Sequence, residues 1–147
     1  MTLSLSVQEQ TTPVLTRHEV TGPRRGAMLP HYFSLYMMVF ENRLYNQMSQ
    51  LVAEYNGAYW NMYELSNGGF YMAPRVSGLL TVEAPNQFTG QLSADAAGIT
   101  ACLYVYSEMS FAVTNEAMRQ TLTKLFHNLR EWALDHEESA LILAAID

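Results

Sequence analysis

Three groups of residues in this 147-residue chain have types and spacings that could support chemistry. His127 and Glu131 lie four positions apart, as two metal ligands do on one face of a helix. Ser93 and Asp95 could act as a nucleophile and an acid, although a serine followed by an early aspartate also marks a capped helix start. The Asn-Gly-Gly tract at 67–69 has the glycines of a phosphate-binding loop.

Each group also has an ordinary structural explanation. His127 and Glu131 fall on a polar helix stripe, and no third ligand stands at a recognisable spacing. A phosphate loop leads into a helix, whereas a second strand is predicted after Gly69. His136 is interpreted as a helix-terminal charge, and the single cysteine, Cys102, as an inert core residue. We therefore predict no catalytic residues, no cofactor and no metal site.

Residues 59–74 predict a β-hairpin, because two aromatic runs are split by a glycine-containing turn. If Asn67 and Gly68 form a two-residue type I′ loop, Ser66 pairs with Gly69. Alternation along the strands then fixes which side chains share a face of the ribbon.

One predicted face of the hairpin carries Trp60, Met62 and Tyr71 with a single carboxylate, Glu64. A solvated face would be more polar, so this face is either covered by the rest of the protein or kept for a partner. In the second case its aromatic residues would be a binding hot spot. In the first case the contact surface is expected at the hairpin turn or beside Asp95. The candidate partner-binding residues are Trp60, Met62, Tyr71, Asn67, Gly68, Gly69 and Asp95.

The elements that would position these residues predict an α+β fold. A small antiparallel sheet of three to four strands, with the hairpin at its centre, is expected to pack with about four helices. The predicted strands are 59–66, 69–74 and 78–83, with room for a fourth at 88–92, and the predicted helices are 34–55, 94–112, one starting at Asn115, and 138–146. Residues 1–27, which contain Pro13 and Pro23, are predicted to be a partly mobile arm, and residues 28–147 a single domain.

The helix at 94–112 is expected to be the buried centre of the fold, because it is apolar nearly all round. Ser93 is its predicted cap, and its middle, at Ala101 and Val105, should be buried. The small residues of the first turns, including Gly98, would allow close approach to another element.

The formal charge of −6 comes from one half of the chain. Residues 1–75 carry five Arg and five Glu, whereas residues 76–147 carry nine acids against Arg119, Lys124 and Arg130. No basic cluster accompanies the sheet aromatics, so direct nucleic-acid binding is not expected. DNA mimicry is not expected either. A mimic needs about one negative charge per 1.7 Å of duplex axis, and a net charge of −6 over 147 residues does not reach that density.

Nothing in the sequence predicts a secretory or membrane segment. Residues 1–12 lack the basic and apolar regions of a signal peptide. The longest run without a charged residue or a histidine, 96–107, has 12 residues, whereas a membrane span needs about 20. A cytoplasmic location is therefore expected.

Two strings in the chain resemble the signatures of the ArdB/KlcA antirestriction family. They are YNGAYWNMYELSNGGFYMAP at 55–74 and LSADAAGI at 92–99. The closing LILAAID at 141–147 also resembles the end of that family, and MLPHYF at 28–33 matches more loosely. The likeness spans about residues 28–147, and Ala58 departs from it where the family often has a second glycine.

The resemblance implies a small protein, carried by plasmids, phages and genomic islands, that protects incoming DNA by blocking host type I restriction-modification enzymes. It implies no catalysis, no cofactor and no DNA mimicry. The implied partner is the restriction enzyme complex, its translocating motor state, or a host factor acting on it. An inhibitory protein-binding protein is the leading interpretation. The alternative is a small enzyme or ligand-dependent regulator with a pocket near Asp95, which convergent polar groups would favour.

Overall fold

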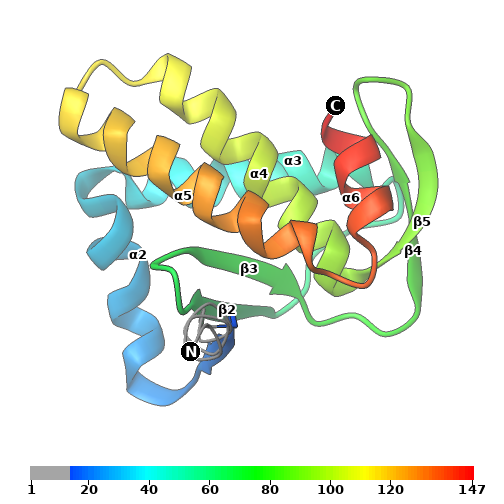
Figure 1. The fold of residues 1–147 in the computed structure, drawn as a ribbon, viewed down its shortest axis with the longest axis horizontal. Helices are drawn as coiled ribbons and strands as arrows, with labels where there is room; N and C mark the ends of the chain where they lie inside the picture. Colours follow the sequence, from blue (N-terminus) through cyan, green and yellow to red (C-terminus); the bar gives the residue numbers. More distant parts are fainter. Residues whose placement is uncertain (1–13) are drawn as a thin grey trace, which may run out of the picture.

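Two helices separate the first strand from four consecutive strands, and three helices end residues 14–147, which are the residues that this computed structural model describes (Figure 1). The strands are β1 Arg17–Val20, β2 Trp60–Leu65, β3 Phe70–Pro74, β4 Leu79–Glu83 and β5 Thr89–Ser93. The α-helices are α2 Arg25–Phe33, α3 Met37–Leu51, α4 Ala94–Ala112, α5 Glu116–Leu134 and α6 Ser139–Ile146, and the short 3₁₀ turns are η1 Gly22–Arg24 and η2 Ser34–Tyr36. The predicted α+β class is confirmed.

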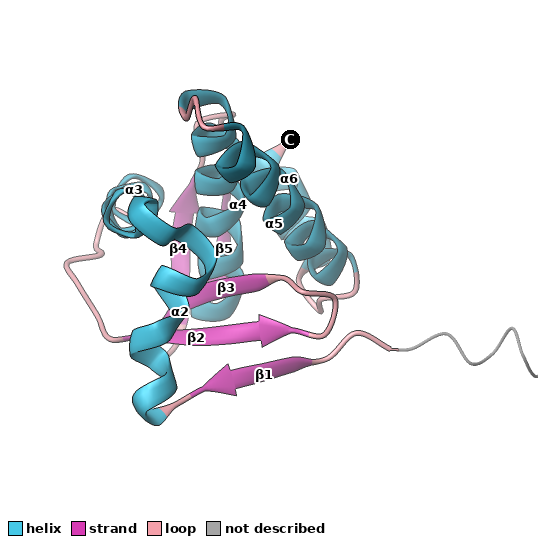
Figure 2. Ribbon diagram, turned by 90° about the vertical axis from the view of Figure 1, so that its left-hand side faces the viewer, coloured by secondary structure: helices cyan, strands magenta, loops and turns pink. Residues whose placement is uncertain are grey.

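The strands form two antiparallel sheets rather than one. The first has the order β1-β2-β3, and the second is the β4–β5 ribbon. Figure 2 shows the first three strands stacked one above another, with the ribbon running in a different direction beside α4. The predicted central hairpin is β2–β3, although β2 is the middle strand because β1 pairs with it.

Strand β1 lies within the segment that the sequence predicted to be an arm. Arg17 pairs with Leu65 and Val20 with Met62, and the Val20 side chain is fully buried. The arm prediction is therefore wrong for residues 17–20, and its residues 1–13 lie outside the described part. The error arose because three of the four β1 side chains are exposed, so the strand lacks a hydrophobic pattern.

Helix α4 is the central element, as predicted. The Ser93 hydroxyl accepts a hydrogen bond from the backbone N of Ala96 at 3.1 Å, which confirms the cap. Ala101 and Val105 are fully buried. A Cβ added to Gly98 would lie 2.6 Å from the Cα of Ala73 in β3. Helix α4 therefore packs closer to β3 than any residue with a side chain at position 98 would allow.

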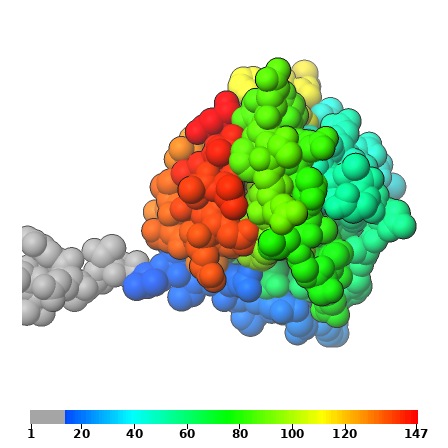
Figure 3. All heavy atoms as spheres, turned by 90° about the vertical axis from the view of Figure 1, so that its right-hand side faces the viewer, coloured from blue at the N-terminus to red at the C-terminus, as the bar shows by residue number. Residues whose placement is uncertain are grey.

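The remaining helices enclose α4. The predicted helix at 34–55 is shorter, since α3 starts at Met37 and ends where Val52 takes an extended conformation. Helix α2 was not predicted, because Pro30 within it is typical of a helix break. Helices α5 and α6 pack against α4, and Figure 3 shows α6 in red beside the β4–β5 ribbon in green. In the described residues no helix is long and apolar enough to cross a bilayer.

Candidate functional site

The hairpin that carries most of the predicted site residues closes in a different register from the predicted one. The backbone N of Leu65 donates to the carbonyl of Gly69 at 2.9 Å, so the loop has three residues, 66–68. Gly68 alone has a positive φ, of 91°. A type I′ loop would also require a positive φ at Asn67, so the predicted two-residue turn is wrong.

A shift of one residue exchanges the faces of a strand. Tyr71 stands opposite Tyr63, and Met62 stands opposite Met72. Trp60 and Met62 therefore share one face of the hairpin, while Tyr71 lies on the other. The prediction that all three share a face is wrong.

Neither aromatic ring of the predicted hot spot is available to a partner. Trp60 is 3% exposed, and its Nε1 donates a hydrogen bond to the hydroxyl of Tyr55 at 3.0 Å. Its ring also lies 5.5 Å from the Tyr45 ring of α3. Tyr71 is 0% exposed. Of the two alternatives left open by the sequence, the protein covers both rings itself, and the exposed hot spot is ruled out.

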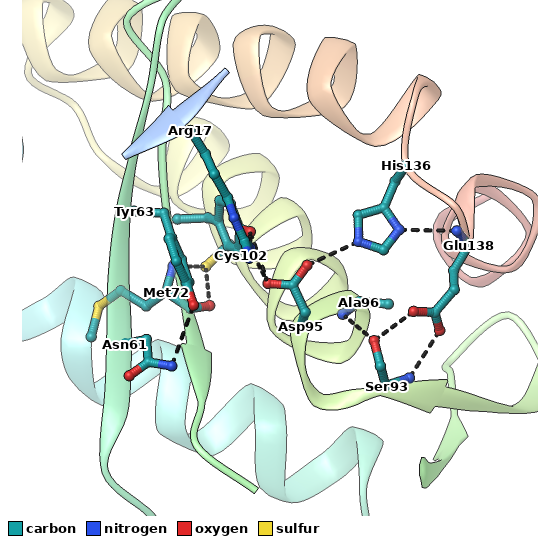
Figure 4. Close-up of polar contacts among 11 residues, drawn as sticks. Arg17, Asn61, Tyr63, Met72, Ser93, Asp95, Ala96, Cys102, His136 and Glu138 are labelled. Atoms are coloured by element: carbon teal, nitrogen blue, oxygen red, sulfur yellow. Dashed lines mark hydrogen bonds and ion pairs between the residues drawn. The ribbon is translucent and has the colours of Figure 1, made fainter. Parts of the chain in front are cut away.

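Asp95 instead receives hydrogen bonds from three elements that are distant in sequence. Arg17 Nη1 from β1 and the Tyr71 hydroxyl from β3 both donate to its Oδ1 at 2.8 Å. His136 Nε2, after α5, lies 2.9 Å from its Oδ2. Arg17 also donates to the Tyr71 oxygen at 2.5 Å, and its Cζ lies 4.1 Å from the centre of the Tyr63 ring. We refer to Arg17, Tyr71, Asp95 and His136 as the Asp95 cluster; Figure 4 shows Arg17 and His136 reaching Asp95 from opposite sides.

The cluster fixes the protonation of its members. Burial opposes ionisation of Asp95, but hydrogen bonds from His136 and Tyr71 and the charge of Arg17 outweigh it, so the pKa of Asp95 lies below its usual value. The hydrogen bond to Asp95 raises the pKa of His136. Because the backbone N of Glu138 donates to His136 Nδ1 at 2.9 Å, the neutral ring carries its proton on Nε2 and donates it to Asp95.

Ser93 makes structural hydrogen bonds and is not activated for nucleophilic attack. Its hydroxyl donates to Glu138 Oε2 at 2.5 Å while accepting from Ala96, and its backbone N donates to Glu138 Oε1 at 2.9 Å. His136 makes its side-chain hydrogen bonds to Asp95 and Glu138, and not to Ser93. The structure therefore supports the helix-cap explanation of Ser93.

An open depression of about 620 Å³ lies beside Asp95, at the place where the sequence left room for a pocket. Its polar lining is largely engaged in internal contacts. Arg75 donates to Asn61 Oδ1 through Nε at 3.1 Å and Nη2 at 2.9 Å, and the Asn61 amide contacts the Tyr63 hydroxyl at 3.3 Å. The carboxylate of Asp95, with its lowered pKa, is poorly suited to act as a general base at neutral pH.

The predicted Asn67–Gly69 turn packs against helix α5. The Asn67 amide donates to the Asn128 carbonyl and to Glu131 Oε1, both at 2.9 Å. A Cβ on Gly69 would meet the Asn128 Cβ at 3.1 Å, so the glycine permits this approach. Glu131 is thereby bound to the hairpin rather than to His127. Among residues 14–147 no three His, Cys, Asp or Glu side chains are grouped so that they could hold a metal ion.

Comparison with known proteins identifies the family. The family profile described as "Antirestriction protein" matches residues 53–147. The chain belongs to the antirestriction protein family. Two KlcA antirestriction proteins of Escherichia coli are each 41% identical to it over 145 residues, with 96% and 97% of this chain and 98% and 100% of the relatives covered.

A solved structure agrees with the fold of this family member. It superposes with a TM-score of 0.85 at 42% identity, covering 92% of this chain and 96% of that one. It belongs to work on KlcA and ArdB, described as having a novel fold and antirestriction activity against type I DNA restriction systems in vivo but not in vitro.

In this antirestriction protein several predicted site residues hold the fold together. The turn joins the hairpin to α5, and Asp95 joins β1, β3 and the α5–α6 connection. Sequence reasoning missed Arg17 and His136 as partners of Asp95. They lie 78 and 41 residues from it, and no local pattern marks such pairs.

Proposed function

We propose that this protein protects incoming mobile-element or phage DNA by inhibiting host type I restriction-modification enzymes in the cytoplasm, through contact with a protein and without mimicking DNA. The observation that carries this proposal is the similarity to KlcA proteins over nearly the whole of both chains, with the same fold as the solved relatives. Similarity that spans nearly the whole of both chains supports a shared activity and not only a shared fragment.

Contact without DNA mimicry is supported by where the acidic side chains lie. Glu64 pairs with Arg24 at 2.9 Å, and Asp95 with Arg17. Glu138 and Glu131 accept internal hydrogen bonds. Carboxylates used in this way cannot form the evenly spaced array that would copy a phosphate backbone.

A binding protein also fits the Asp95 cluster better than an enzyme does. A catalytic general base needs a pKa near its working pH, whereas the hydrogen bonds from His136 and Tyr71 and the charge of Arg17 hold the pKa of Asp95 below its usual value. The cluster connects strands and helices and so stabilises a surface presented elsewhere.

The target is a state or component that exists in a restricting cell. The relatives' activity in vivo but not in vitro supports this choice, because an inhibitor of the isolated enzyme would act in both settings. The translocating motor state of the restriction complex and a host factor acting on that complex both meet this condition.

The test is phage plating on cells that carry a type I system, with and without this protein. Unmodified phage should plate at least about tenfold better when the protein is expressed, whereas phage already modified by the same system should plate equally well on both. Equal restriction of unmodified phage, with the protein present and folded, would overturn the proposal. An isolated enzyme cleavage assay in parallel separates action on the enzyme from action on a cellular component.

A further inference from the structure

Among the described residues, the two most exposed large apolar side chains lie on either side of helix α5. Leu35, in the turn between α2 and α3, is 94% exposed, and Phe111, near the end of α4, is 86% exposed. Fold stability explains neither, because each leaves almost its whole side chain in water.

Both side chains border depressions formed with the first half of α5. Phe111 and Phe126 line one of about 470 Å³ between α4 and α5. Leu35 lines another of about 330 Å³, with Ala117 and Thr121 of α5 on its wall. Side chains on the outer face of α5, between these two, border a third open depression of about 550 Å³. In Figure 1, α4 and α5 run side by side toward the turn that joins them.

This face also holds cationic side chains, although the protein as a whole is acidic. All three Lys and Arg residues of the segment 76–147 belong to α5, and two of them, Arg119 and Lys124, line this face together with Glu116 and His127. Arg119 is held by Glu116 at 3.2 Å and by the Val113 carbonyl at 3.0 Å. Lys124 makes no ion pair with any residue from 14 to 147.

We propose that this surface, formed by Leu35, Phe111, Arg119, Lys124 and His127 and called here the α5 surface, binds an acidic segment of a partner protein that also carries apolar anchor side chains. Charge complementarity decides the chemistry, since Lys124 is left without an ion pair among residues 14–147 on a protein whose formal charge is −6. Phe111 and Leu35 supply apolar contacts on both flanks. The proposal rests on the proposed function, for which it names the contact surface.

Two other occupants fit the α5 surface less well. A second copy of this chain, joined by a two-fold axis, would bring the cations of both copies together. Nucleic acid would leave Leu35 and Phe111 facing a polar backbone, and it needs more cations than this surface holds.

Phe111→Ser and Lys124→Glu test the α5 surface in the phage-plating assay. Each substitution should lower the plating of unmodified phage on restricting cells at least about tenfold. That is the effect expected when an interface hot spot is lost. Leu79→Ser in β4 and Arg43→Glu in α3 are matched controls, because they likewise replace an apolar side chain by Ser and a cation by Glu at exposed positions elsewhere. The controls should protect like the unsubstituted chain. Both test side chains are exposed, so the melting temperature should move little.

The outcomes separate this inference from the proposed function. If the unsubstituted chain gives no protection, the proposed function fails, and the α5 surface fails with it. If the unsubstituted chain protects and the two α5 variants protect equally well, or the controls lose as much, only the α5 surface is overturned. A dimer of the purified chain that the α5 variants dissociate would assign the surface to self-association. If the purified chain retains a labelled 30-base-pair duplex and Lys124→Glu abolishes this binding, the α5 surface would be assigned to nucleic acid. Either result overturns the proposal.

Discussion

At the scale of single residues, Asp95 shows how one carboxylate can organise a small fold. It receives a guanidinium from β1, a phenol from β3 and an imidazole from the α5–α6 connection. Burial and the Asp95 carboxylate raise the pKa of Tyr71, so its hydroxyl stays a donor across the physiological range. Hydrogen bonds to a charged group contribute about 1.5–3 kcal/mol each, and more is lost when a partner is left unpaired.

Asp95→Asn should therefore destabilise the fold by about 2–3 kcal/mol, because an amide cannot accept from both the Arg17–Tyr71 side and His136 without placing its NH₂ against a donor. Denaturant unfolding measures this difference. Asp135→Asn is the matched control, since Asp135 is an exposed aspartate whose side chain makes no hydrogen bond with the described residues. A loss equal to that of the control would contradict the assigned role.

The same variant carries a pH signature. The pKa of Asp95 is lowered in the folded state, so its stabilisation is present above the usual aspartate pKa of about 3.9 and is lost as the pH falls through the lower folded value. The stability difference between the unsubstituted chain and Asp95→Asn should be full at pH 7 and should shrink progressively below about pH 4. A difference that stays constant to pH 2 would exclude ionised Asp95 as its cause.

At the scale of elements, the contact of α4 with β3 depends on the absence of a side chain at Gly98. Gly98→Ala places a Cβ 2.6 Å from both the Ala73 Cα and the Met72 carbonyl oxygen, which are backbone atoms and cannot rotate away. The helix must move, at a cost of about 3 kcal/mol. Gly26→Ala in α2 meets no atom within 4 Å, and should be neutral or stabilising by up to about 1 kcal/mol. Melting temperatures of the two variants should shift in opposite directions or differ by several degrees; equal shifts would contradict the close contact.

The same elements show what the sequence could predict about the fold. Helix α4 was predictable from end to end, because its cap and its apolar composition are both local signals. The hairpin was predicted, but its register depends on which residue takes a positive φ. Asn67 was free to do so by its chemistry, yet its side chain is held by α5, and only Gly68 adopts that conformation. The register that places Tyr71 on its face therefore comes with a tertiary contact to a residue 61 positions away, which no local pattern signals.

The candidate site was less predictable than the fold for the same reason. Asp95 stood out by its position at the start of a helix, and its cap partner Ser93 followed from spacing. The side chains that give Asp95 its role come from β1 and from the α5–α6 connection, and β1 has no pattern of its own. The α5 surface could not be inferred either, because the exposure of Phe111 at the end of an apolar helix is a property of the assembled fold.

At the scale of the whole molecule, the charge of −6 on this small protein serves more than one purpose. Some carboxylates build the fold, as Asp95, Glu64 and Glu138 do. Others are exposed and make no hydrogen bond or ion pair with residues 14–147. This second set keeps the surface hydrated and the molecule apart from its copies. A DNA mimic would instead need that exposed set for binding.

The triple variant Glu54→Gln, Glu83→Gln and Glu137→Gln tests this distinction, because each side chain is exposed and outside the internal contacts. The formal charge rises from −6 to −3, so a mimic would lose half of its net electrostatic attraction to a DNA-binding channel. For an inhibitor that binds through the α5 surface, removing remote acids leaves the contact intact. We expect protection of unmodified phage within about threefold of the unsubstituted chain, with a melting temperature that moves little. Glu138 is left out of the set, because its bonds to Ser93 would confuse folding with binding. Loss of protection by tenfold or more in a folded triple variant would restore DNA mimicry as the mechanism.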